Sequence, residues 1–168
     1  HVLLEAFDRL RSEAPEARLV VVGDGPARAH LESIAPHGVQ FMGELRDEAL
    51  AQVYASADLF CFPSTTDTFG QVLLEAAASG LPAVAAAAGG ALELVDDGVT
   101  GLLVAPDDAA TLAAALAELV RDEPRRLALG EGALAYARRR SWEVADAELL
   151  AAYDAVASTH LLCPRLAA

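Results

Sequence analysis

Short apolar runs alternate along the chain with longer segments of helical periodicity. The first run, residues 18–23, has no polar alternation, which is typical of a strand covered on both faces in a parallel sheet. Further runs predict strands at 39–43, 59–62, 83–86 and 101–104, the Ala-rich run at 83–86 being the weakest signal. Gly and Pro punctuate the ends of these runs, as expected where strands turn into loops.

Apolar residues spaced three and four apart predict the helices. One helix is expected from the start of the chain to Pro15, and a second, after the turn at 23–26, ends at about residue 35. Further helices are expected at 47–57, 69–79, 89–95, 107–121, 124–139 and 141–157. Asp107 or Asp108 is expected to cap the helix at 107–121, and Ser141 the helix at 141–157. Strands alternating with helices predict an α/β domain with a doubly wound, Rossmann-like parallel sheet over 1–157, extra C-terminal helices and a loose tail at 158–168.

Composition narrows the function classes. The 168 residues suffice for one hydrophobic core, and a formal charge of −13 argues against nucleic acid as a partner. The longest uncharged stretch, residues 76–92, is interrupted by Pro82 and predicts no transmembrane segment. Cys and His residues lack ligand spacing, so we expect no metal site, no disulfide and a cytoplasmic setting. The chain begins with helical periodicity and has no initiator Met, so we expect it to be a piece of a longer protein.

The loop after the first strand invites a dinucleotide-binding interpretation. Gly23 and Gly25 match the first two positions of a Gly-x-Gly-x-x-Gly pattern, but Arg28 stands where the third Gly belongs. Glu44 lies at the spacing of a ribose-binding acid. One coincidence of spacing is weak, so we favour an ordinary tight turn.

The loop before the predicted helix at 69–79 contains more candidate ligand-binding groups than the loop after the first strand. Free backbone N–H groups at Phe69, Gly70 and Gln71, together with the helix dipole, are expected to bind a phosphate. Asp67 and Glu75 flank this anion site as two carboxylates able to hold sugar hydroxyls. The simpler alternative is that Asp67 caps the helix and Glu75 belongs to its solvent face. Spacing alone favours that alternative.

These residues also carry a resemblance. The Asp-x7-Glu frame from Asp67 to Glu75 resembles the acidic motif, usually written Glu-x7-Glu, of retaining GT-B glycosyltransferases of family 4. Further segments resemble that family in the same order, at residues 19–26, 41–45, 54–60, 89–95, 97–104 and 141–143. The chain is similar to the C-terminal, nucleotide-sugar-binding half of such an enzyme.

The resemblance implies roles for particular residues. Glu75 would bind the donor ribose and Asp67 a hydroxyl of the donor sugar, both acting in catalysis, while the main chain at Phe69, Gly70 and Gln71 would meet the sugar and diphosphate. The loop that would hold the base through backbone contacts consists of Met42, Gly43, Glu44 and Leu45. Gly89 and Gly90 would either crowd the donor phosphates or simply form a turn.

Some parts of the family pattern are absent from this chain. In the family, a strand that ends in Gly-Arg, followed by a Lys at the start of the next helix, comes just before the region that matches the start of this sequence. This Arg and this Lys clamp the diphosphate. The acceptor-binding N-terminal domain is absent too, so we expect weak donor binding and no transfer by this chain alone. The first central strand of the sheet would also be absent. Either the strands at 18–23 and 59–62 pair directly, or strand exchange, a dimer or another segment fills the slot.

The resemblance implies a retaining, metal-independent transfer of a hexose from a GDP- or UDP-linked donor, such as mannose from GDP-mannose, to a lipid or saccharide. No cofactor other than this co-substrate is expected. The enzyme would be bacterial and cytoplasmic, reaching the inner membrane face through the N-terminal domain. Two alternatives stay open: a GT-B sugar-nucleotide epimerase, and a non-catalytic module that binds a nucleotide sugar or a protein.

Overall fold

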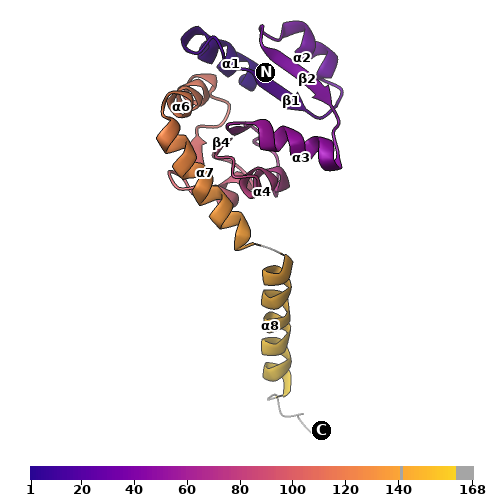
Figure 1. The fold of residues 1–168 in the computed structure, drawn as a ribbon. Coiled ribbons are helices and arrows are strands. Elements are labelled where there is room, and N and C mark those ends of the chain that lie inside the picture. The colour runs from indigo at the N-terminus through magenta and orange to yellow at the C-terminus, as the bar shows by residue number, and fades with distance from the viewer. Residues whose placement is uncertain (141, 162–168) are drawn as a thin grey trace.

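The computed structural model describes residues 1–140 and 142–161. Most elements gather into one body, from which the last helix extends away (Figure 1). The strands are β1 (Leu19–Val22), β2 (Val39–Gly43), β3 (Phe60–Phe62), β4 (Ala83–Ala86) and β5 (Gly101–Val104). The helices are α1 (Val2–Glu13), α2 (Arg28–Ile34), α3 (Asp47–Ser56), α4 (Gln71–Ala78), α5 (Ala91–Leu94), α6 (Ala109–Arg121), α7 (Glu123–Arg138) and α8 (Trp142–Leu161). This confirms the predicted α/β alternation.

All described strand pairs are parallel, but they form two sheets. One sheet is β1–β2, with Leu19 opposite Val39, and the other has the order β3-β4-β5. Within the described residues β1 and β3 do not pair, so direct pairing, one of the two alternatives that the sequence left open, is wrong. The position of β1 is fixed instead by α1, which leads into it and packs through Phe7 and Leu10 into the same core as α6.

Burial also departs from expectation at β1. Its residues alternate between half-buried and exposed, Val20 being 44% and Val22 36% exposed, so the strand is not covered on both faces as predicted. The exposure of β1 has two causes. The strand pairs on one side only, and none of the residues of α2 is buried. The weakest predicted strand, β4, is fully buried, because it is the central strand of its sheet.

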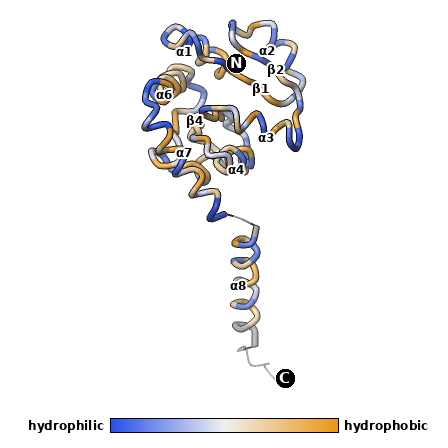
Figure 2. Tube along the Cα trace, in the orientation of Figure 1, coloured by the Kyte–Doolittle hydropathy of each residue, from blue (hydrophilic) through white to orange (hydrophobic). Residues whose placement is uncertain are grey.

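The main core lies between the β3-β4-β5 sheet and the helices α1, α6 and α7. Its fully buried side chains include Val84, Leu112 and Leu119. Figure 2 shows hydrophobic residues along β1 and α6, and hydrophobic and polar residues alternating along α8. A second cluster around Phe62 and Leu94 packs α4 and α5 near the end of β3.

The C-terminal helices have well-defined starts. Asp107 and Asp108 are the alternative predictions for the cap of α6. Asp108 is the cap, because its Oδ1 accepts the N–H groups of Ala110 and Thr111. Those bonds lower the pKa of Asp108. The predicted cap Ser141 lies outside the described residues, as do 162–168 of the predicted tail. Helix α8 continues to Leu161, past the expected end at 157.

Several large apolar side chains of α8 are exposed, including Leu149, Leu150 and Tyr153. None of the helices in the described part of the chain has the length and apolar character needed to cross a bilayer.

Core packing predicts a large effect for Leu119→Ala. Leu119 is fully buried in α6, so its truncation leaves a cavity and should lower the free energy of unfolding by about 2–5 kcal/mol. The control is Leu127→Ala in α7, where the side chain is 59% exposed and we expect a change below about 0.5 kcal/mol. Urea unfolding followed by circular dichroism measures both, and equal losses would contradict the assigned core.

Candidate functional site

Two loops meet at the carboxyl edge of the larger sheet. One follows β3 and contains Asp67, and the other follows β4 and contains Gly89 and Gly90. The Gly90 N–H donates to the Asp67 backbone carbonyl at 3.1 Å. A Cβ on Gly89 would lie 2.1 Å from that carbonyl oxygen, and a Cβ on Gly90 would lie 2.3 Å from the Phe69 oxygen. The glycine pair is therefore needed for the close approach of these loops, a role that the sequence did not reveal.

The Asp67 carboxylate closes the turn that leads into α4. Its Oδ1 accepts the backbone N–H groups of Phe69, at 2.9 Å, and Gly70, at 2.5 Å. The prediction that these two N–H groups are free is therefore wrong, because the nearby carboxylate takes both. Only the Gln71 N–H, of the three expected donors, has no acceptor among the described residues.

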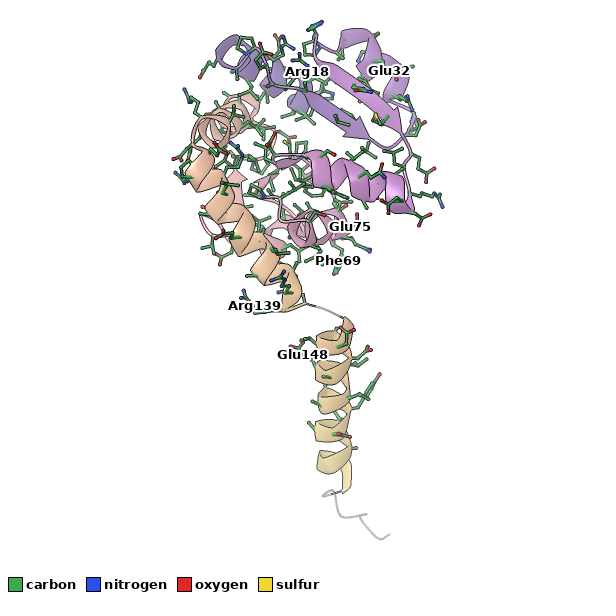
Figure 3. All side chains as sticks on the ribbon, in the orientation of Figure 1. Arg18, Glu32, Phe69, Glu75, Arg139 and Glu148 are labelled. Carbon is green, nitrogen blue, oxygen red and sulfur yellow. The ribbon has the colours of Figure 1, made fainter. Side chains whose placement is uncertain are left out.

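Gly70, not Asp67, occupies the N-cap position of α4. It has a left-handed backbone with φ +72°, and an added Cβ would lie 3.1 Å from the Leu73 side chain. The alternative in which Asp67 caps the helix is therefore wrong, because its carboxylate accepts N–H groups of the turn just before the helix. Figure 3 shows Phe69, whose side chain is 61% exposed, near the start of this helix.

Glu75 lies in α4 and is half-buried, so it is not a simple member of a solvent face. The Tyr54 hydroxyl, near the end of α3, donates to Glu75 Oε2 at 3.1 Å. Burial, the Glu75 charge and this hydrogen bond together raise the pKa of Tyr54 to about 12. Its ring also contacts Phe60 at a centroid distance of 5.9 Å. Sequence reasoning used Tyr54 only as part of the motif at 54–60 and missed this contact.

The predicted base-binding loop lies at the end of the smaller sheet. Gly43 is buried, Met42 is 39% exposed, Leu45 is half-buried, and Glu44 pairs with Arg46 on the surface. In the described part of the chain, no hydrogen bond or ion pair joins this loop to the loop of Asp67. The structure thus brings residues 67–71 and 89–90 together and leaves 42–45 in a separate sheet.

Arg28 lies next to the predicted base-binding loop at residues 42–45. It forms ion pairs with Asp24, at 3.0 Å, and Glu32, at 2.8 Å. A Cβ on Gly43 would lie 2.9 Å from its guanidinium. The Gly25 N–H and Arg28 lower the pKa of Asp24. The residue that breaks the Gly-x-Gly-x-x-Gly pattern therefore packs against the predicted base-binding loop, which supports the tight-turn interpretation of residues 23–28.

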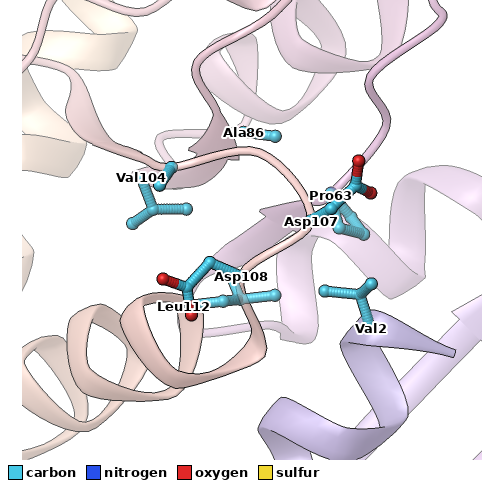
Figure 4. Close-up of a pocket in the computed structure, with 8 residues that line it drawn as sticks. Val2, Pro63, Ala86, Val104, Asp107, Asp108 and Leu112 are labelled. Atoms are coloured by element: carbon cyan, nitrogen blue, oxygen red, sulfur yellow. The ribbon is translucent and has the colours of Figure 1, made fainter.

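Two cavities are lined by other residues. A small one of about 10 Å³, at the carboxyl ends of β3, β4 and β5, has room for about one water molecule (Figure 4). A larger one of about 510 Å³ lies between α1 and the end of α2. Neither cavity is lined by a predicted site residue. In the described residues, no three His, Cys, Asp or Glu side chains gather as a metal site would require.

Comparisons with known proteins identify relatives. The family model described as glycosyl transferases group 1 matches residues 1–122. The chain is 40% identical to a D-inositol 3-phosphate glycosyltransferase of Stackebrandtia nassauensis, over 98% of this chain and 40% of that protein. It is 42% identical to a GDP-mannose-dependent alpha-mannosyltransferase of Mycolicibacterium smegmatis, over 84% of this chain and 37% of that protein. The chain thus spans well under half the length of these relatives.

The fold agrees with these relatives. The crystal structure of HepE from Anabaena in complex with UDP superposes with a TM-score of 0.79 at 29% identity. That match covers 93% of this chain and 44% of HepE. It confirms the prediction that the fold is the C-terminal half of a GT-B glycosyltransferase.

The contact between Tyr54 and Glu75 is testable by titration. Glu75→Gln removes the negative charge that favours the neutral phenol, so the pKa of Tyr54 should fall from about 12 toward its ordinary value of 10. NMR of ¹³C-labelled tyrosine rings measures this, with the Tyr54 signal identified by its loss in Tyr54→Phe. Glu131→Gln, on the exposed surface of α7, is the control, and identical titrations of all proteins would refute the contact.

The loop contact predicts that Gly90→Ala is destabilising. The new methyl group would overlap the Phe69 backbone, so we expect a loss of about 1–3 kcal/mol in the free energy of unfolding. Gly25→Ala is the matched control, because nothing lies within 4 Å of its Cβ position. Thermal and urea unfolding compare them, and equal stability of the two variants would contradict the close approach.

Proposed function

The chain belongs to the glycosyl transferases group 1 family, and from this membership we propose that it is the donor-binding domain of a retaining, metal-independent family 4 glycosyltransferase. The observation that carries the proposal is the convergence of Asp67, Gly89, Gly90 and the start of α4 at one carboxyl edge of a parallel sheet. Ligands of open α/β folds bind beyond that edge. Glu75 extends the same surface along α4, where Tyr54 holds it.

The carboxylates take different parts of the donor. Glu75 accepts hydrogen bonds from the ribose hydroxyls through the oxygen that Tyr54 leaves open. Asp67 uses Oδ1 for the Phe69 and Gly70 N–H groups, so Oδ2 is left for a hydroxyl of the donor sugar. The unpaired Gln71 N–H and the positive end of the α4 dipole face the diphosphate. This anion site is smaller than the sequence suggested.

The base is held by the backbone of residues 42–45. This loop ends β2, so the nucleotide bridges the two sheets of the domain, with its base at one and its sugar at the other. A GDP-linked donor is supported by the mannosyltransferase relative, and a UDP-linked donor by the ligand of HepE. A hexose, for instance mannose, is then transferred to a lipid or saccharide.

Transfer requires groups that this chain does not supply. Retention without a metal depends on cationic groups that stabilise the leaving diphosphate electrostatically. We propose that a preceding segment of the longer protein brings an Arg and a Lys together with a strand between β1 and β3. An N-terminal domain brings the acceptor. A strand exchanged from a second copy is the other way to fill this position, since unpaired backbone groups of a strand are costly when buried.

Nucleotide titration tests donor binding. The chain should bind GDP or UDP, or the corresponding sugars, more tightly than ADP, as measured by calorimetry or NMR shifts. Glu75→Ala removes charged hydrogen bonds to the ribose and should weaken binding about ten- to hundredfold. Glu131→Ala, on the exposed surface of α7, should bind as the unchanged chain does. Equal binding by Glu75→Ala removes Glu75 from the donor site, and no binding of any nucleotide overturns the proposal.

The chain alone should not transfer sugar. Incubation with radiolabelled GDP-mannose or UDP-glucose and a mixture of lipid and saccharide acceptors should give no labelled product, because the cationic clamp and the acceptor domain are not part of it. Labelled product formed by this chain, and lost in Glu75→Ala, would show that the residues described here suffice for catalysis.

A further inference from the structure

Helix α3 connects the two halves of the candidate site. It begins at Asp47, shortly after residues 42–45 at the end of the smaller sheet, and Tyr54 near its C-terminal end contacts Glu75 of α4. None of its residues is buried. Within the described residues, its other side-chain hydrogen bonds stay inside the helix, such as those of Gln52 and Ser56. The bond from Tyr54 to Glu75 is thus the polar contact that attaches α3 to the helix of the candidate acid.

The Tyr54 hydroxyl is well placed to orient a carboxylate. Its ring is half-buried and lies against Phe60 at an interplanar angle of 53°, which limits the directions that the hydroxyl takes. A phenol donates one hydrogen bond, and an ionised carboxylate has about four acceptor positions on its two oxygens. Tyr54 therefore occupies part of Oε2 and leaves Oε1 of Glu75 available. The phenol remains neutral and a donor at physiological pH, since its pKa is about 12.

We propose that Tyr54 is a positioning residue for ribose recognition: its hydroxyl holds the Glu75 carboxylate in the orientation that accepts both ribose hydroxyls. This inference rests on the proposed donor-binding function and adds a residue to it. Because Tyr54 belongs to the helix that starts at the base loop, the same contact sets the distance between the base and ribose subsites. Tyr54 itself does not touch the reacting atoms.

A role in packing α3 against α4 predicts something different. A looser α3 would weaken the binding of every nucleotide to the same degree. Loss of orientation at Glu75 weakens binding of the ribonucleotide more than that of its 2′-deoxy analogue, because the analogue lacks one of the two hydroxyls whose hydrogen bonds Glu75 accepts. The ratio of affinities for a ribonucleotide and its 2′-deoxy analogue therefore separates the two roles.

The experiment measures Kd for UDP, GDP and their 2′-deoxy analogues by calorimetry on the full chain. The unchanged chain should prefer the ribonucleotide, and Tyr54→Phe should reduce that preference about three- to tenfold, with a smaller loss of affinity for the 2′-deoxy form. Tyr136→Phe is the matched control, because it removes a hydroxyl that donates to the Glu93 carbonyl at 2.8 Å, outside the site. In the Glu75→Ala background, Tyr54→Phe should have no further effect on the ratio.

The outcomes are distinguishable. An unchanged ratio in Tyr54→Phe, or an equal loss for both forms of the nucleotide, overturns the positioning role and leaves donor binding intact. No binding of any nucleotide by the unchanged chain overturns the proposed function and this role with it. Circular dichroism checks the fold of Tyr54→Phe, and Tyr54→His is the second variant. It keeps an aromatic ring with an N–H donor on a shorter side chain, and a ribose preference above that of Tyr54→Phe supports the role.

Discussion

Parallel pairing of β3, β4 and β5 is the constraint from which the candidate site follows. It sends the loops after β3 and β4 to the same edge, where Asp67 and the glycine pair at 89–90 meet. The contact is close because Gly89 and Gly90 have no side chains, so the backbone of one loop lies against that of the other. Asp67 then uses its carboxylate to finish the turn. The edge of the sheet is thus organised by backbone geometry before any ligand binds.

Electrostatics impose a second constraint. The sequence contains no lysine, and its formal charge is −13. Several arginines are already paired with carboxylates, among them Arg28 with two partners and Arg125 with Glu118. In the proposed donor site, the N–H dipoles at the start of α4 would therefore carry much of the attraction for a dianionic donor.

The sequence predicted the order and type of the elements well, since hydrophobic periodicity depends on local burial alone. It predicted β2, β4 and β5 with their observed bounds. It failed where tertiary contacts decide the result. Exposure of Val20 depends on the neighbours of β1, and the bonds of the Phe69 and Gly70 N–H groups depend on where the Asp67 carboxylate folds back. The partner of Tyr54 lies 21 residues away, on another helix, so no local pattern indicates it.

Helix α8 gives the molecule an unusual thermodynamic profile. Its 20 residues extend away from the body and span about 30 Å (Figure 1), and residues 143–157 are exposed. An isolated helix of this length is marginal in water and gains or loses its turns gradually. The body around Leu119 unfolds cooperatively. Heating should therefore reveal a shallow, noncooperative loss of ellipticity before the main transition, and a calorimetric enthalpy lower than the chain length suggests.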